Sequence, residues 1–460
     1  MTAPAAHPPA DARGIRARLD AAPMSPYQWM VVGLCVLLNT LDGFDVMAMA
    51  FTAGAVGEDF ALSGTQIGLL LSAGLVGMAL GSLLLAPLAD TWGRRGVVLG
   101  CVALAGAGML GSALAPTALT LGATRVVTGL GVGGILACTN VVASEFSNDR
   151  RRGLAIGIYT AGYGVGATIG GLAAITLQES FGWRGVFWTG TVLTLGALVL
   201  LAALLPESVD HQVHRGRASD LPRVNRVLVR MRQEPLASLA DGLPDPADAA
   251  DGSGPPPARQ VGSLLAGPLR RPTLLVWLAF FATMFGFYFV NSWTPTLLSR
   301  AGLSPDQAAS AGMALALGGA AGSVLYGLVT AGRAPRRVLV VFTVLAAVAM
   351  VALVLSISVL ALALVVGVVV GALVNGCVAG LYTVTPGLYD ARVRGTGMGW
   401  GIGVGRIGAI LAPLLTGRLV DAGWSATQLY VGAACVLLVA AGAVLALGAA
   451  PSRRATLVRS

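Results

Sequence analysis

The chain has 460 residues, of which 55% are apolar and only 11% are charged, and its mean hydropathy is +0.78. These values exclude an ordinary soluble protein and are typical of a polytopic membrane protein. The formal net charge of +9 would also suit nucleic-acid binding, but the arginines follow membrane topology, so we expect no nucleic-acid partner.

Apolar stretches of about 20 residues, the length that crosses a bilayer as a helix, recur twelve times along the chain. They predict an all-α integral membrane protein with an N-terminal half over 29–205 and a C-terminal half over 273–449. We assign 1–28 and 450–460 to cytoplasmic tails and 206–272 to a cytoplasmic linker. The expected spans are 29–54, 66–87, 96–114, 119–143, 154–176 and 185–205, followed by 273–297, 307–330, 337–357, 359–384, 395–417 and 427–449.

The distribution of arginine predicts the orientation in the membrane. If the N-terminus is inside, the inner loops and tails hold 25 arginines, whereas the outer loops hold only Arg184, Arg300 and Arg418. This bias predicts a multi-pass protein of the inner cell membrane with both termini in the cytoplasm. Within the linker, 221–233 has a basic amphipathic pattern that favours the inner membrane surface. The Pro/Gly/Asp-rich stretch 241–260 is expected to be disordered and to act as a tether.

The two halves repeat each other at an offset of 241–242 residues. GSLLLAPLADTWGRRGVVLG (81–100) aligns with GSVLYGLVTAGRAPRRVLVV (322–341), and Gly182-Trp183 aligns with Gly423-Trp424. Two parallel six-helix repeats with a midplane site between them resemble the architecture of the major facilitator superfamily.

The loop LADTWGRR (88–95), between the second and third spans, resembles the loop signature of that superfamily. Gly93 permits a tight turn, Arg94 and Arg95 anchor the cytoplasmic face, and Asp90 can cap the next helix or pair with an arginine. The resemblance implies a latch that holds the outward-facing state. A purely positive-inside anchor is the alternative interpretation, and the two are compatible.

The loop departs from the family pattern at Ala86 and Thr91, and its second copy (330–337) lacks the acid, so we expect any latch there to be weak. Glu145 matches an acid in the family's fourth span. We expect Glu145 and the run Asp149–Arg152, which includes Arg152, to take part in structural pairing at the cytoplasmic face, linked to the gate, rather than to contact substrate.

Two acids lie inside the first span, in the sequence LDGFD (41–45). Asp42 and Asp45 are three residues apart and therefore share one helical face. A charge in hydrocarbon costs roughly 2.5–3.5 kcal/mol, so two acidic residues within a membrane span indicate a functional role. Two carboxylates this close should titrate as a coupled pair, which a proton carrier requires. The alternative is one acid paired with Arg125 for structure and the other beside a water-filled cavity.

LDGFD (41–45), RVVTGLGVGG (125–134), FYFVNSWTPTLL (287–298) and GRIGAILAP (405–413) together resemble the aromatic acid:H⁺ symporters of the major facilitator superfamily. The resemblance covers nearly the whole chain except the linker and tails. It implies uptake of a benzoate-like, hydroxybenzoate-like or phenylpropionate-like carboxylate in symport with protons.

Two arginines lie inside spans. Arg125 is six residues into the fourth span, and because the family places the first and fourth spans side by side, it can pair with an acid of the first. Snorkelling to the outer interface is the alternative. Arg406 lies near the middle of the eleventh span, and its planar guanidinium suits bidentate carboxylate recognition. We expect Arg406 to be the main substrate anchor, with Arg125 assisting; a structural pair with a first-span acid is the alternative for Arg406.

Aromatic and polar side chains of the C-terminal half are further candidates for substrate contact. Phe285, Tyr288 and Phe289 of the seventh span offer flat apolar walls for an aromatic ring, although lipid-facing bulk or an interfacial belt is the alternative for each. Asn375 and Tyr382 of the tenth span are candidates for hydrogen bonds to substrate.

Other functional classes would require different features of the sequence. A membrane-embedded enzyme would need a histidine, cysteine or serine constellation at membrane depth, and a channel would not need the latch loop; within transporters, a sugar, aliphatic-acid or drug carrier stays open. The three histidines lie outside the spans and the five cysteines lack metal-ligand spacing. We therefore expect no cofactor or metal, the proton as coupling ion, a small organic anion and the lipid bilayer as partners, and a monomer.

Overall fold

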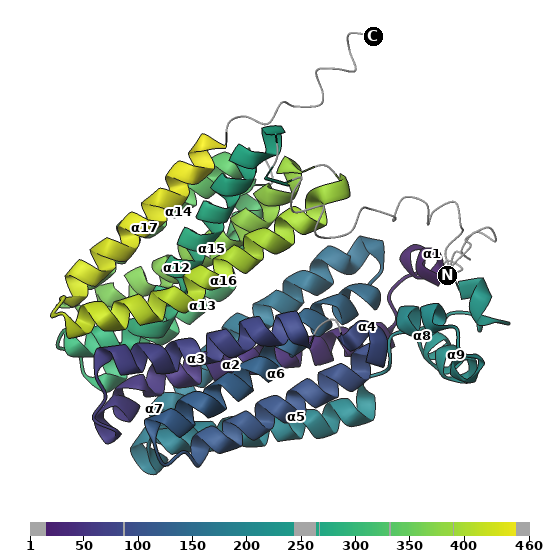
Figure 1. The fold of residues 1–460 in the computed structure, drawn as a ribbon, viewed down its shortest axis with the longest axis horizontal. Coiled ribbons are helices and arrows are strands. Elements are labelled where there is room, and N and C mark those ends of the chain that lie inside the picture. The colour runs from purple at the N-terminus through teal and green to yellow at the C-terminus, as the bar shows by residue number, and fades with distance from the viewer. Residues whose placement is uncertain are drawn as a thin grey trace, which may run out of the picture. The chain divides into compact units, whose positions relative to one another are not determined.

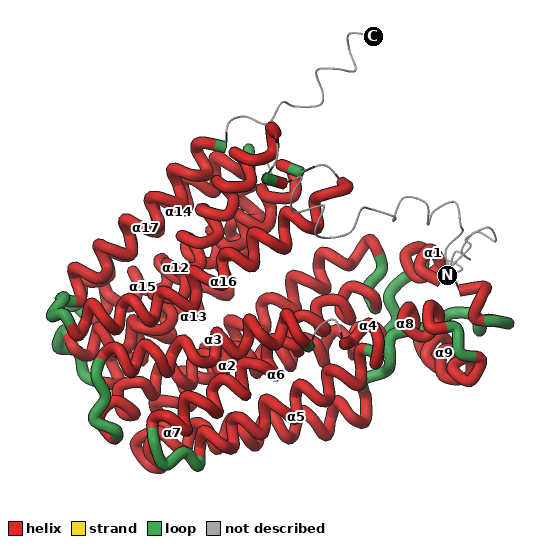
Figure 2. The backbone as a smooth tube through the Cα atoms, viewed as in Figure 1, coloured by secondary structure: helices red, strands yellow, loops and turns green. Residues whose placement is uncertain are grey.

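The computed structural model describes residues 15–85, 88–242, 264–265, 267–330, 333–389 and 391–447. Every regular element in these ranges is a helix, as Figure 2 shows. Figure 1 labels the longer ones. The membrane helices are α2 (Pro26–Asp59), α3 (Gly64–Leu84), α5 (Arg94–Ala113), α6 (Ala118–Glu145), α7 (Asp149–Leu204), α12 (Arg270–Arg300), α13 (Pro305–Thr330), α14 (Pro335–Leu355), α15 (Leu360–Val384), α16 (Ala391–Asp421) and α17 (Ala426–Ala446).

Each expected span overlaps one of these long helices and extends at most three residues beyond it, and two of the spans fall on α7. Its two arms meet at Gly182, whose φ of 63° and ψ of −175° break the helical path. Among the described residues, eleven stretches are long and apolar enough to cross a membrane, and Ala174–Leu204 is the one within α7.

Glycines let the membrane helices approach closely, as in many membrane bundles. At the crossing of α3 and α6, a Cβ atom added at Gly81 would collide with the carbonyl oxygen of Leu130, and one added at Gly133 would collide with that of Met78. The backbones are therefore in direct contact, which explains part of the high glycine content.

The chain divides into two compact units. The first unit comprises 1–45, 76–166 and 187–253, and the second unit comprises 46–75, 167–186 and 254–460. In the second unit, the Asp421 carboxylate at the end of α16 accepts hydrogen bonds from the Gly64 N–H and from the Thr65 N–H (2.7 Å) at the start of α3. The end of α2, the start of α3 and the middle of α7 thus belong to the same unit as α12 to α17.

Short elements cover one end of the first unit: α1 (Ile15–Ala21), α4 (Leu88–Trp92), α8 (Val209–Arg215), η1 (Ala218–Asp220), α9 (Leu221–Arg230) and η2 (Leu239–Gly242). A further turn, η4 (Gly267–Leu269), precedes α12, and η5 (Thr385–Leu388) follows α15.

The helix predicted from the basic amphipathic pattern at 221–233 forms as α9, but its environment differs from the expectation. Val224 and Leu228 are fully buried within the protein, so the apolar face of α9 packs against protein rather than lipid. The expected tether at 241–260 lies, beyond Gly242, outside the described residues.

Candidate functional site

Arg125 on α6 and Asp45 on α2 form a buried, bidentate ion pair in the first unit. The guanidinium Nη1 and Nη2 atoms donate to the two carboxylate oxygens, each at 2.7 Å. Both side chains are less than 9% exposed. The guanidinium also lies 5.7 Å from the centre of the Phe187 ring. Arg125 therefore does not snorkel to an interface, and of the two acids expected to share a face it pairs with Asp45.

Asp42 lies one helical turn before Asp45 and is 4% exposed. A cavity of about 20 Å³ adjoins both carboxylates and is also lined by Thr128 and Thr194. A single water molecule needs about 10–15 Å³ measured in this way. Asp42 therefore borders a mostly apolar cavity with the volume of one water molecule, while the charge of Asp45 is already matched by Arg125.

A hydrogen-bond network holds the same face of α2 against α6 and α7. The Asn39 amide donates to the Tyr159 carbonyl oxygen (2.6 Å), and the Tyr159 hydroxyl lies 3.1 Å from the Thr139 hydroxyl. The sequence analysis did not single out Thr139. A hydroxyl inside an otherwise apolar span was the only available signal.

At the opposite end of α6, Glu145 joins two segments. Its Oε1 accepts from Arg94 Nε (2.9 Å), and its Oε2 accepts from the Ser208 hydroxyl (2.7 Å). The structure thus brings together Arg94 and Glu145, which the sequence nominated separately. The side chain of Asp90 lies outside the described residues.

The turn before α5 is built around Gly93, whose φ of 97° favours glycine. A Cβ atom there would collide with the carboxylate of Glu207. That carboxylate accepts a hydrogen bond from the Arg95 N–H (3.1 Å), and the Arg95 side chain donates to the Ala202 carbonyl oxygen (2.6 Å). Glu207 is a member of this network that sequence reasoning missed.

Arg152 pairs with two acids, Asp149 on its own helix and Asp20 on α1, each at 2.9 Å. Asp20 also accepts from Arg16 Nη2 (2.7 Å). Burial raises the pKa of the Asp20 carboxyl above its ordinary value, and the positive charge of Arg16 opposes that shift.

The N-terminal helix α1 is bound to the end of α6 by the same arginine. Arg16 donates to the backbone carbonyl oxygens of Glu145 (2.9 Å), Ser147 (2.8 Å) and Ser144 (3.4 Å). The last carbonyls of a helix lack partners within it, so Arg16 satisfies groups that would otherwise need water.

In the second unit, Arg406 on α16 lies beside a cluster of aromatic rings. It is close enough to Tyr382 on α15 for the two to interact electrostatically. The Tyr382 ring meets Phe280 edge to face at 5.9 Å, and Trp277 stacks on Trp400 at 5.7 Å. Tyr382 and Trp400 are 41% and 45% exposed, so each leaves part of its ring uncovered by protein.

The three aromatic side chains of α12 that were predicted to form a wall for the substrate ring differ in their burial. Phe289 is 1% exposed and meets Tyr430 edge to face at 5.1 Å, so it lies in the core of the second unit. Tyr288 is 8% exposed and meets the Phe287 ring at 5.1 Å. Phe285 is half-buried.

Asn375 on α15 is half-buried, and its amide donates to the Gly371 carbonyl oxygen of the same helix (3.1 Å). Arg406 and Tyr382, two of the predicted substrate contacts in the second unit, are close enough to interact electrostatically. Trp400, which the sequence analysis did not nominate, stacks on Trp277 and is 45% exposed.

Residues 35–333 and 276–459 match the profile of the Major Facilitator Superfamily, and the chain belongs to that family. The prediction of a helical membrane transporter with two six-helix repeats is confirmed, and the alternative of an enzyme is set aside.

Several named relatives match almost end to end. The chain is 32% identical to the 4-hydroxybenzoate transporter PcaK of Pseudomonas aeruginosa, over 94% of this chain and 95% of that one. It is 32% identical to the gallate transporter of Pseudomonas putida (97% and 98% covered). It is 31% identical to the 3-(3-hydroxy-phenyl)propionate transporter of Escherichia coli K12 (92% and 95% covered).

Among solved structures, the inward open conformation of the xylose transporter XylE from E. coli matches with a TM-score of 0.72. The match covers 93% of this chain and 98% of that one, at 14% identity, and therefore supports the fold alone.

Proposed function

We propose that the protein imports an aromatic carboxylate in symport with protons by alternating access. The observation that carries this proposal is the buried pairing of Arg125 with Asp45, which leaves Asp42 beside a water-sized cavity. The names of the relatives, which are transporters of 4-hydroxybenzoate, gallate and hydroxyphenylpropionate, support the substrate class.

In this mechanism Asp42 is the group that changes charge. Arg125 matches the charge of Asp45 in bidentate geometry, and this pair holds α2 against α6. A proton taken up by Asp42 removes the remaining negative charge from that face. The cavity beside Asp42 has the volume of one water molecule, which is the space a proton donor would need to reach the carboxylate.

Arg406 binds the substrate carboxylate in this mechanism, and Tyr382 and Trp400 contact its ring. A guanidinium matches a carboxylate in two hydrogen bonds, and exposed aromatic faces suit an aromatic ring. Protonation of Asp42 and neutralisation of Arg406 by the anion each remove a charge, which lowers the cost of the conformational change. We retain Phe285, Tyr288 and Asn375 as secondary contacts; the burial of Phe289 favours a packing role.

The cytoplasmic latch comprises Gly93, Arg94, Arg95, Glu145 and Arg152, with Asp90 as a further member. The arginine distribution supports cytoplasmic termini in the inner cell membrane. We propose a monomer that needs no cofactor beyond the coupling proton.

Uptake into proteoliposomes tests the proposal. Vesicles containing the purified protein, with an acidic outside, should accumulate radiolabelled 4-hydroxybenzoate, and a protonophore should abolish accumulation. Unlabelled benzoates should compete, whereas xylose, succinate and cationic drugs should not. Accumulation that is unchanged by the protonophore would exclude proton coupling. Competition by a sugar, an aliphatic acid or a drug would indicate a different class of substrate.

A further inference from the structure

The two repeats end their first helices in the same register. α2 ends at Asp59 and α12 ends at Arg300, 241 residues later. The turns that follow, at 63–66 and 304–307, keep this offset and make matching hydrogen bonds. In each turn the serine N–H donates to the glutamine side-chain oxygen (2.8 and 3.1 Å), and the glutamine N–H donates to the serine hydroxyl (3.3 Å in both).

The connections between the last two helices of each repeat are also equivalent. Gly182 and Gly423 both have positive φ, 63° and 85°, and a tryptophan follows each. Position 59 therefore corresponds to 300, and 183–184 corresponds to 424–425.

In the first repeat these positions form a closed cluster. The Asp59 carboxylate accepts from the Trp183 indole N–H and from Arg184 Nη1, both at 3.0 Å. The guanidinium of Arg184 lies 4.2 Å from the Trp183 ring centre and 5.8 Å from that of Phe60. A carboxylate thus binds an indole and a guanidinium that are stacked on each other.

In the second repeat the equivalent positions carry a cation and a neutral residue in place of an acid and a cation. Arg300 replaces Asp59, Ser425 replaces Arg184, and Ala301 replaces Phe60, while Trp424 keeps the tryptophan. Within the described ranges, no acidic side chain forms an ion pair with Arg300. The nearby acid Asp421 is engaged by backbone N–H groups of α3.

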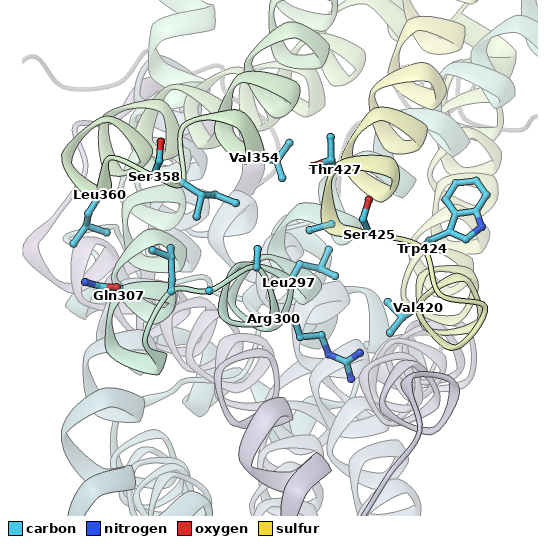
Figure 3. Close-up of a pocket in the computed structure, with 15 residues that line it drawn as sticks. Leu297, Arg300, Gln307, Val354, Ser358, Leu360, Val420, Trp424, Ser425 and Thr427 are labelled. Atoms are coloured by element: carbon cyan, nitrogen blue, oxygen red, sulfur yellow. The ribbon is translucent and has the colours of Figure 1, made fainter.

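An open pocket of about 950 Å³ occupies the place of the missing contacts. Figure 3 shows Arg300, Val420 and Trp424 on one side of it and Gln307 and Leu360 on the other. Ligand pockets usually measure about 300–1,000 Å³, so one small aromatic acid fits with room for water. Trp424 is 43% exposed, which leaves indole surface available for contact.

The lining combines one cation with neutral groups. Ser358, Ser425 and Thr427 add hydroxyls, Gln307 adds an amide, and Leu297, Leu303 and Ile357 add apolar surface. An anion with a flat apolar body and a polar substituent matches this lining. In the first repeat, the chain itself supplies a carboxylate beside the tryptophan, that of Asp59.

We propose that this pocket is a second binding site for an aromatic carboxylate, with the carboxylate on Arg300 and the ring against Trp424. The identity of the ligand rests on the proposed function, and under the proposed orientation the pocket opens to the outside. The site holds substrate loosely, because Arg300 is solvent-exposed and one benzoate fills only part of the volume. Its role is to raise the local concentration of the anion before transport.

The direct test uses the full chain carrying Arg406→Gln, which removes the anion anchor of the proposed transport site. Equilibrium dialysis against radiolabelled 4-hydroxybenzoate should still detect weak, saturable binding. Adding Arg300→Gln should reduce its affinity at least about 3-fold, the effect expected of an exposed ionic contact. The matched control is Arg418→Gln, which removes another exposed outer arginine that does not line the pocket and should change nothing.

A repeat-swap variant provides a second test. Arg300→Asp together with Ser425→Arg rebuilds two residues of the first-repeat cluster, and it should abolish the weak binding; because Ser425 caps the start of α17, Ser425→Arg alone is the control for the lost cap. In the otherwise native chain, Arg300→Gln should raise the KM for uptake about 3- to 10-fold at an unchanged maximal rate.

The outcomes separate the two proposals. Equal binding and equal KM in the Arg300→Gln and Arg418→Gln variants, with uptake intact, would overturn the second site and leave the transport proposal standing. Arg300-dependent binding in a chain that takes up no 4-hydroxybenzoate would support the pocket and contradict the transport proposal.

Discussion

Arg125 and Asp45 bind each other through two parallel hydrogen bonds of 2.7 Å in the interior of the first unit. The pair ties α6 to α2 and gives one of the two acids of α2 a fixed counter-charge. The sequence alone could not distinguish Asp42 from Asp45, which lies one turn away. The pairing of Asp45 with Arg125 distinguishes the two acids.

Breaking this pair should destabilise the protein. Arg125→Gln leaves a buried carboxylate without its counter-charge, and we expect a loss of about 3–5 kcal/mol in the free energy of unfolding. Thermal unfolding of the purified protein, followed by tryptophan fluorescence, measures the change. The joint replacement of Arg125→Met and Asp45→Leu removes both charges and should recover most of the loss. Unfolding of Arg125→Gln at the native temperature would contradict the structural role, with Arg418→Gln as control.

Asp42→Asn should separate exchange from accumulation. The amide cannot change its charge, so substrate exchange across vesicles with equal pH should continue while accumulation driven by a pH gradient should be lost. Counterflow and gradient-driven uptake, measured on the same preparation, give the two rates. An Asp42→Asn variant that still accumulates substrate against a gradient would assign proton coupling elsewhere.

Arg406→Gln should raise the KM for 4-hydroxybenzoate about 10- to 100-fold, because a hydrogen bond to a charged group is worth about 1.5–3 kcal/mol. Arg406→Lys keeps the charge but loses the planar fork and should recover only part of the affinity. Full recovery by lysine would show that charge alone, rather than bidentate geometry, binds the anion. Initial uptake rates over a range of substrate concentrations distinguish these results.

The Arg94–Glu145 pair should show coupling in a double-mutant cycle. The Nε–Oε1 contact of 2.9 Å is partly exposed, so we expect a coupling energy of about 0.5–1 kcal/mol between Arg94→Gln and Glu145→Gln. Melting temperatures and transport rates of the two single variants and the double variant provide the cycle. Strictly additive effects would mean that the two side chains act independently.

Much of the fold followed from the sequence, because a bilayer-crossing helix needs a long apolar stretch and such stretches are easily recognised. The break inside Asp149–Leu204 followed as well, since Gly182, whose φ of 63° interrupts the helical path, lies between the expected spans 154–176 and 185–205. The resemblance indicated that Arg125 pairs with an acid of the first span, but it did not say which one. Asp42 and Asp45 share a helical face, so only the rotation of α2 in the structure decides that the partner is Asp45.

The aromatic residues of α12 illustrate where sequence patterns fail. A helix that is apolar on all sides carries no stripe that distinguishes the protein core from a cavity wall, so Phe289 and Phe285 were indistinguishable before their burial was known. The contact of Arg16 with α6 joins groups about 130 residues apart, and no local periodicity signals such a pairing.

The attachment of α1 to α6 bears on how the protein is produced for experiments. Because Arg16 satisfies three carbonyl groups at the end of a membrane helix and Asp20 binds Arg152, this segment is an integral part of the folded protein. Truncation beyond Ile15, or an affinity tag fused directly in front of it, would strip or crowd those contacts. Any purification handle on this side therefore belongs upstream, behind a flexible spacer.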